Sequence, residues 1–196
     1  MKTDIVLAGV GGQGILTIAT VIGRAALQQN LYLKQAEVHG MSQRGGDVQS
    51  NLRISDNPIA SDLIPLGSAD LILSLEPMEA LRYTPYISRK GWMITNTVPF
   101  INTNNYPDEK ELLDELKSFD NLVAFDMDQI AKEAGSPKSA NMVLLGAASP
   151  FLTLSEETLL DSIKQIFANK KESIIEMNCN AFMAGRNVTL NYLNSK

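Results

Sequence analysis

The chain has 196 residues, of which 44% are hydrophobic and 20% are charged, and its formal net charge is −5. This balance is typical of one globular domain and excludes a disordered chain, while the acidic balance and the lack of a Lys/Arg cluster argue against a nucleic-acid partner. A single cysteine and a single histidine exclude an internal disulfide, a cysteine-ligated iron–sulfur cluster and an ordinary zinc site within this chain.

The N-terminal part of the chain predicts two strands joined by a helix, followed by an irregular loop. An apolar strand is expected at residues 5–9, an amphipathic helix at 13–29 and a second strand at 31–38. The polar loop that follows interrupts this rhythm. Residues 49–55 then alternate apolar and polar side chains, which predicts a half-exposed strand that runs antiparallel to the others.

The remainder of the chain alternates strands with helices. Strands are expected in the segments ADLILSLE, GWMITNT and NLVAFDM, and helices at residues 77–83, 112–117, 128–135, 141–148, 153–169 and 171–192. This alternation predicts an α/β fold: a three-layer α/β/α Rossmann-like domain with a mostly parallel sheet and at least one antiparallel strand. No repeat or linker divides the sequence, so we expect residues 1–196 to form a single domain.

The sequence also bears on location. No apolar run reaches the length needed to span a membrane, and the N-terminal residues lack a signal-peptide cleavage pattern. We therefore expect a cytoplasmic protein without a membrane partner.

A glycine-rich turn lies between the first strand and the first helix. Gly9, Gly11 and Gly14 fit the pattern G-x-G-x-x-G in the strand–turn–helix context that the pattern requires. The first glycine is expected to permit the tight turn, the second to let a ligand approach the backbone and the third to let the helix pack on the strand. Free N–H groups at the helix start favour a phosphate or carboxylate, with Gly12 and Gln13 at the mouth of the site. The alternative is a sharp connection that binds no ligand.

Glu37 tests how far this turn resembles a dinucleotide site. A dinucleotide-binding domain needs an acidic residue near the end of its second strand, about 20 residues after the glycines, and Glu37 stands there. A second crossover helix should then follow, whereas a polar loop and an alternating strand follow in this chain. This departure counts against NAD or FAD as the ligand.

The loop AEVHGMSQRGGD, residues 36–47, concentrates polar side chains and glycines at the end of the second strand. Its candidate binding residues are Glu37, Ser42, Gln43, Arg44, Gly45 and Gly46. Ligands of open α/β sheets lie beyond the carboxyl ends of the strands, so this loop and the glycine turn are expected to meet over one crevice. Arg44 would then clamp a phosphate or carboxylate. A pairing of Glu37 with Arg44 and a protein-contact role for the loop are the alternatives.

Two further polar residues are candidates for the crevice. His39 would act as an acid–base group, and the alternative is a neutral imidazole hydrogen-bonded within the loop, because no nucleophile or metal partner is visible in the sequence. Asn96 ends an expected strand and would either line the crevice or cap a turn. No residues are expected to bind a metal.

The two loops together resemble a known family. GVGGQGI followed by AEVHGMSQRGG is similar to the gamma-type subunit or domain of 2-oxoacid:ferredoxin oxidoreductases, and the likeness extends through ADLILSLEPMEALR and NMVLLGA. Within that family, a free-standing chain of this length resembles most the beta subunit of indolepyruvate ferredoxin oxidoreductase. The gamma subunits of the pyruvate and 2-oxoisovalerate enzymes are the alternatives.

The resemblance implies an oxidative decarboxylation in which a 2-oxoacid and coenzyme A become an acyl-CoA and carbon dioxide, and two electrons pass singly to ferredoxin. It also implies that thiamine diphosphate, Mg²⁺ and [4Fe–4S] clusters belong to a large alpha subunit, while this chain helps to hold coenzyme A at the subunit interface. The residue inventory agrees, because Cys179 alone cannot ligate a cluster and no Gly-Asp-Gly diphosphate motif is present. We therefore expect the chain to be inactive alone and to meet ferredoxin only indirectly, while self-association of the isolated chain stays open.

Two functions of other classes remain open on the sequence. One is a stand-alone NAD(P)- or FAD-dependent reductase, which rests on Gly9, Gly11, Gly14 and Glu37. The other is a structural adaptor whose glycine turn binds nothing. Saturable NADH binding by the isolated chain would distinguish the reductase from the other two.

Overall fold

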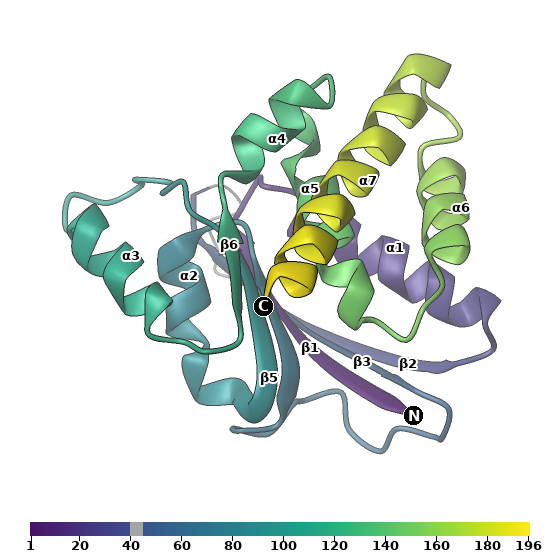
Figure 1. Cartoon of the computed structure of the whole chain (residues 1–196). Helices are drawn as coiled ribbons and strands as arrows, with labels where there is room; N and C mark the ends of the chain where they lie inside the picture. Colours follow the sequence, from purple (N-terminus) through teal and green to yellow (C-terminus); the bar gives the residue numbers. More distant parts are fainter. Residues whose placement is uncertain (40–44) are drawn as a thin grey trace.

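The computed structural model describes residues 1–39 and 45–196, which form a six-stranded mixed sheet with helices on both faces (Figure 1). The strands are β1 (Lys2–Val10), β2 (Tyr32–His39), β3 (Asp47–Ser55), β4 (Ala69–Ser74), β5 (Ile87–Asn96) and β6 (Leu122–Phe125). The helices are α1 (Ile15–Gln28), α2 (Pro77–Arg82), α3 (Glu109–Lys117), α4 (Met127–Glu133), α5 (Ala140–Ala148), α6 (Glu156–Ile166) and α7 (Glu172–Ser195). Each strand and helix expected from the sequence is present, although β5 begins at Ile87 and not at residue 91.

The order of the strands in the sheet is β2-β3-β1-β4-β5-β6. β3 pairs antiparallel with β1 and with β2, whereas β1, β4, β5 and β6 pair in parallel. Among the described strands β3 alone runs against the rest, which confirms the mostly parallel sheet and its antiparallel member. β3 lies between β2 and β1. In a dinucleotide-binding domain the strand next to β1 is β2, so β3 occupies that place in this chain.

Helices cover the two faces of the sheet unequally. α1, α5, α6 and α7 lie on one face, and α2 and α3 lie on the other (Figure 1). Each face has its own buried apolar cluster, with Leu7 and Leu73 in the larger and Val6 and Ile72 in the smaller. The expected three-layer α/β/α architecture is therefore confirmed. No helix of residues 1–39 and 45–196 is both long enough and apolar enough to cross a membrane.

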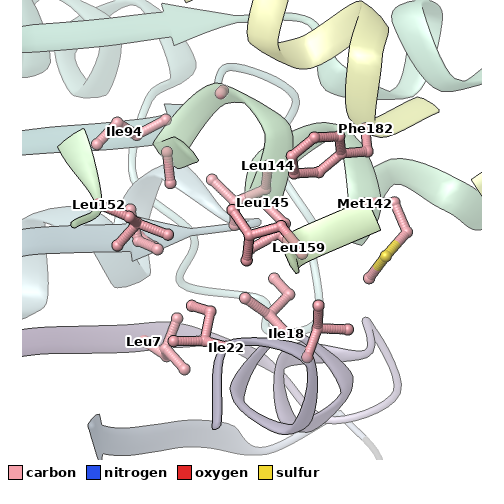
Figure 2. Packing of buried hydrophobic residues seen from close by; sticks show 14 of the residues in the cluster. Leu7, Ile18, Ile22, Ile94, Met142, Leu144, Leu145, Leu152, Leu159 and Phe182 are labelled. Atoms are coloured by element: carbon pink, nitrogen blue, oxygen red, sulfur yellow. The ribbon is translucent and has the colours of Figure 1, made fainter. Parts of the chain in front are cut away.

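The larger cluster joins elements from both halves of the chain. Figure 2 shows Leu7 of β1 and Ile22 of α1 close together, with Leu145 of α5 and Leu159 of α6 in the same cluster. All four side chains are fully buried, and burial of one such side chain contributes about 1.5–3 kcal/mol relative to its exposure. This packing fixes α1, and with it the turn that precedes α1, against the sheet.

α5 and α7 approach each other unusually closely, and we call their contact the α5–α7 seam. A Cβ atom added at Gly146 of α5 would lie 1.8 Å from the carbonyl oxygen of Phe182, and one added at Gly185 of α7 would lie 2.0 Å from that of Val143. Thr189 Oγ1 donates a hydrogen bond across the seam to the carbonyl of Ala147 at 2.9 Å. The seam therefore leaves no room for side chains at these two glycines.

The single tryptophan packs between the sheet and the C-terminal part of the chain. Trp92 of β5 packs against Phe151, with ring centroids 4.7 Å apart, and the ammonium of Lys196 lies 5.1 Å from the Trp92 ring centroid. Trp92 is thus a packing residue that joins β5 to the C-terminal helices.

Candidate functional site

The carboxyl ends of β1, β4, β5 and β6 and the start of β3 meet at one edge of the sheet, the upper edge in Figure 1. The amide of Gly11 donates to the carbonyl of Gly46 at 2.8 Å, and the amide of Gly45 donates to the carbonyl of Gly11 at 3.3 Å. Asn102 Nδ2, from the loop after β5, donates to the carbonyl of Gly45 at 2.6 Å. Among the described residues, the glycine turn and the end of the 36–47 loop therefore meet, as expected.

The glycine turn leaves the start of α1 open. Gly12 and Gly14 have left-handed backbones with φ of 105° and 84°, and Gly14 is the N-cap of α1 without a side-chain hydrogen bond to the helix. The first N–H groups of α1 are therefore available to a ligand, and the helix dipole favours an anion there. The turn therefore depends on Gly12 and Gly14 for its backbone conformation.

Gly9 and Gly14 are required mainly for space. A Cβ at Gly9 would lie 2.9 Å from Gln13 Oε1 and 2.9 Å from Ile15 Cγ1, so this glycine makes room for the turn that follows it. A Cβ at Gly14 would lie 2.6 Å from Nδ2 of Asn141 in α5. Gly14 therefore allows close contact with α5, and its expected role in packing the helix on the strand stays a prediction.

The side-chain amide of Gln13 forms hydrogen bonds within the protein. Its Oε1 accepts from the amide of Val10 at 2.8 Å, and its Nε2 donates to the carbonyl of Leu75 at 3.1 Å. The side chain thus joins the end of β1 to the end of β4, where the chain leaves these strands in different directions. Gln13 lines the cleft described below. Because both polar atoms of its side chain bond to backbone groups, its role is to hold the ends of β1 and β4 together and not to bind a ligand.

Asn96 is buried and forms the turn after β5. Its Oδ1 accepts from the amides of Met127 at 3.0 Å and Val98 at 3.3 Å, and its Nδ2 donates to Asp128 Oδ2 at 2.9 Å. Asn96 also lines the cleft described below. The two alternatives for this residue thus hold together, because it lines the site through a side chain whose polar atoms are engaged in the turn.

Glu37 lies at the end of β2 with an exposed side chain that accepts a 2.6 Å hydrogen bond from Gln35 Nε2. Since β3 stands between β2 and β1, the end of β2 lies two strand spacings, about 10 Å, from β1. In a dinucleotide-binding domain the acidic residue stands on the strand next to β1. The position of Glu37 therefore does not match that of the acidic residue that binds the ribose in such a domain.

Four expected site residues lie wholly or partly outside the described residues. These are Ser42, Gln43 and Arg44, and the side chain of His39, whose backbone ends β2 opposite Val48. Their expected roles in anion binding and acid–base chemistry stay predictions.

Two hollows flank the glycine turn, and Gly12 lines both. The first, a cleft of about 530 Å³, is lined by Gly12, Gln13, Leu75, Asn96, Val98, Pro99, Phe100, Asp128, Pro137, Lys138 and Ala140. The second, of about 410 Å³, is lined by Val10, Gly11, Gly12, Gly14, Ile15, Leu16 and Val48. The first includes the polar side chains of Gln13, Asn96, Asp128 and Lys138, whereas the second is mainly apolar. Both hollows therefore adjoin the turn that precedes α1.

Lys138 is a site residue that the sequence did not indicate. It lies in the 3₁₀ turn η2 (Pro137–Ser139) before α5 and is an exposed cation in the wall of the 530 Å³ cleft. Its local sequence, SPKSAN, resembles any capped turn before a helix, so a lysine there carries no signal of its own. Only the fold brings it beside Gly12.

Glu76 is a completely buried carboxylate at the end of β4. Its Oε2 accepts from the amide of Glu79 at 2.8 Å, which makes it the N-cap of α2, and its Oε1 accepts from the amide of Phe100 at 3.3 Å and from the Tyr106 hydroxyl. Burial and the bond to Glu76 raise the pKa of Tyr106, so its hydroxyl stays protonated and donates. Burial also raises the pKa of Glu79, although Arg82 Nε lies 2.9 Å away.

The described residues hold no group of three His, Cys, Asp or Glu side chains that could bind a metal ion. The site offers the first N–H groups of α1, the ammonium of Lys138 and apolar walls, and it also contains the carboxylate of Asp128, which accepts a hydrogen bond from Asn96.

The sequence matches one protein family over most of its length. Residues 4–188 match the family described as pyruvate ferredoxin/flavodoxin oxidoreductase. The chain belongs to this family. It is 40% identical over 192 residues to the indolepyruvate oxidoreductase subunit IorB of Thermococcus kodakarensis, covering 93% of each chain. It is 37% identical over 194 residues to the subunit of the same name from Methanothermobacter thermautotrophicus, covering 94% of this chain and 96% of that one.

A solved structure of this oxidoreductase family has a similar fold. It is the 2-oxoglutarate:ferredoxin oxidoreductase from Magnetococcus marinus with 2-oxoglutarate, coenzyme A and succinyl-CoA bound, with a TM-score of 0.76 and 23% identity. The match covers 97% of this chain but 31% of that polypeptide, so this likeness shows the fold alone. The family match and the two relatives confirm the family predicted from the two loops: the chain is a relative of the small subunits of 2-oxoacid oxidoreductases.

Proposed function

We propose that the chain is the small subunit of an indolepyruvate-type 2-oxoacid:ferredoxin oxidoreductase, in which it forms a single domain that contributes a coenzyme A site. The observation that carries this proposal is the glycine turn, whose uncapped α1 amides lie between a 530 Å³ cleft and a 410 Å³ hollow. The indolepyruvate substrate rests on the relatives at 37% and 40% identity. Gamma subunits of pyruvate or 2-oxoisovalerate enzymes are the nearest alternatives.

The residues at the turn fit the chemistry of coenzyme A. Its phosphates would lie at the first N–H groups of α1, with Lys138 as the cation beside them. Its adenine would fit the apolar hollow formed by Ile15, Leu16 and Val48. Its pantetheine arm would then follow the other cleft, along Phe100 and away from the sheet.

The electron chemistry belongs to a partner in this proposal. A large alpha subunit would supply thiamine diphosphate with Mg²⁺ for decarboxylation and [4Fe–4S] clusters that pass electrons to ferredoxin. This chain contains one cysteine, Cys179, which is half-buried in α7, and burial raises the pKa of its thiol. A single cysteine cannot ligate a cluster, so the subunit would act only within the assembly. We also infer a cytoplasmic location, which the low cysteine content favours.

Co-expression with the large subunit tests the assembly. We expect the two chains to purify together and to oxidise indolepyruvate in a coenzyme A-dependent reaction, while neither chain alone does so. Recovery of the two as separate proteins, with full activity in the large chain, would contradict the proposal.

Lys138 tests the coenzyme A site. In the assembled complex, Lys138→Ala should raise the KM for coenzyme A about tenfold, because a charge-assisted contact to phosphate is lost. Lys132→Ala is the matched control, since Lys132 is an exposed lysine of α4 that does not line the cleft. An equal effect of both substitutions would show that general charge and not the cleft governs binding.

The stand-alone reductase is less well supported. Glu37 lies about 10 Å from β1 because β3 is inserted between the two strands. We expect NADH to show no saturable binding to the isolated chain in a calorimetric titration. Tight binding of a nicotinamide nucleotide would revive that alternative.

A further inference from the structure

The loop between β5 and α3 forms one wall of the proposed coenzyme A cleft. We call residues 97–107 the strap; in Figure 1 its teal trace lies at the upper end of the strands, as does the purple turn before α1. Val98, Pro99 and Phe100 of the strap line the 530 Å³ cleft, and Lys138 lines it too. The cleft thus has an apolar wall supplied by the strap and a cation supplied by the turn before α5.

Hydrogen bonds hold the strap at several points along its length. The amide of Val98 donates to Asn96 Oδ1 at 3.3 Å, and Asn102 Nδ2 donates to the carbonyl of Gly45 at 2.6 Å. Between and beyond these, the amide of Phe100 and the hydroxyl of Tyr106 both donate to Glu76 Oε1. Glu76 is therefore the one acceptor among these that holds two separate parts of the strap.

The strap also supplies hydrogen-bond donors that the buried side chain of Glu76 needs. The carboxylate is 0% exposed, and a buried carboxylate needs hydrogen-bond donors to offset its lost hydration. Its donors are the amide of Glu79 in α2 and the two strap groups from Phe100 and Tyr106. If the strap moved away, Oε1 would lose both of its donors. The buried charge therefore favours one position of the strap.

We propose that Glu76 is a positioning residue for coenzyme A, which holds the strap so that Val98, Pro99 and Phe100 form the wall for the apolar arm of the ligand. This inference rests on the proposed function. Val98 and Phe100 are 37% and 45% exposed in this chain, which leaves apolar surface available to that arm. The anionic end would lie toward Lys138 and the start of α1. Glu76 itself lines neither hollow, so it acts through the strap.

Tyr106→Phe in the assembled oxidoreductase is the most selective test, since it removes one donor to Glu76 and keeps the ring. We expect the KM for coenzyme A to rise about tenfold, as for the loss of one hydrogen bond to a charged group, with kcat within about twofold of the parent. Amide hydrogen exchange across residues 97–107 should rise by a similar factor. Tyr86→Phe is the matched control, because Tyr86 is a half-buried tyrosine packed against Tyr83, with ring centroids 6.1 Å apart, and lines neither hollow.

A second variant guards against a purely structural effect. Glu76→Gln keeps one carbonyl acceptor but places an amide donor where the carboxylate accepted, so it should loosen the strap at least as much as Tyr106→Phe. Unchanged exchange across the strap in both variants would overturn the proposal, as would faster exchange with an unchanged KM for coenzyme A. If the parent complex shows no dependence on coenzyme A, the proposed function fails. The exchange data would still decide whether Glu76 holds the strap.

Discussion

The α5–α7 seam and the glycine turn both depend on glycine, but for different physical reasons. In the seam, Gly146 and Gly185 lie within regular helices, and only the absence of a side chain matters. Each would place a Cβ within 2.0 Å of a carbonyl oxygen on the other helix, a distance that no repacking of side chains can relieve, because the neighbour is backbone. The glycines of the seam therefore contribute to the stability of the fold.

In the glycine turn the backbone conformation matters first. Nothing lies within 4 Å of a Cβ added at Gly12, and its requirement is the left-handed φ of 105°. Gly14 combines the two reasons, with a φ of 84° and a Cβ position 2.6 Å from Asn141 Nδ2. Substitutions in the two regions should therefore separate the loss of folding free energy from the loss of ligand binding.

Gly146→Ala should have the largest effect on stability. We expect the free energy of unfolding to fall by at least about 3 kcal/mol, because the two helices must move apart. Thermal unfolding would measure this as a lower Tm. Gly23→Ala is the control, since that helical glycine of α1 would place its Cβ 3.0 Å from Leu33 Cδ2, the movable end of a side chain. Equal Tm values for the two variants would contradict the close backbone contact in the seam.

Gly14→Ala should come next and should affect both stability and binding. A left-handed alanine costs about 1–2 kcal/mol, and the contact with Asn141 adds to this, so we expect a total loss of about 2–3 kcal/mol. The KM for coenzyme A should rise in the same variant, because the first turn of α1 shifts. A variant with parent stability would show that the turn adopts another backbone conformation.

Gly12→Ala should affect binding more than stability. The cost to folding should be about 1–2 kcal/mol, from the backbone conformation alone, while the new methyl group would stand between the two hollows. Gly67→Ala is the matched control: it also has a left-handed backbone, with φ of 68°, and open space around its Cβ, but it lies before β4 and away from the site. Both should lower the Tm similarly, and only Gly12→Ala should raise the KM for coenzyme A.

Asn141→Ala should have the smallest effect alone and should modify that of Gly14→Ala. Asn141 Nδ2 donates to the carbonyl of Gly14 at 3.3 Å, and loss of this bond should cost about 1 kcal/mol. Because the shorter side chain also removes the contact with an alanine at position 14, Gly14→Ala should cost less in this background. A double-mutant cycle on chemical unfolding measures the coupling. Additive costs would show that strain in the backbone is the whole effect at position 14.

The strands and helices could be predicted because their signals are local. The alternation in residues 49–55 and the glycines after β1 each specify one element through a few neighbouring side chains. The position of β3 between β1 and β2 could not be predicted in this way, since strand order depends on pairing between residues far apart in the chain. That position is also what separates Glu37 from the glycine turn.

The site was predictable only in part. The convergence of the glycine turn and Gly45–Gly46 followed from the rule that ligands bind at the carboxyl ends of strands. The roles of Gln13 and Asn96 did not, because an amide in a loop gives no sign of which backbone groups it will meet. Lys138 and Tyr106 were missed for a similar reason: Lys138 lines the cleft from the turn before α5, Tyr106 contacts Glu76 from the loop after β5, and only the fold brings either residue to its partner.

The placement of Trp92 has a practical consequence. It is the only tryptophan of the chain, and it is stacked on Phe151 four positions before the end of β5, about 13 Å along the strand from Asn96. Its fluorescence should therefore respond strongly when the C-terminal helices separate from the sheet and only weakly when a ligand enters the cleft. One emission spectrum can thus follow unfolding of this subunit without interference from ligand titration.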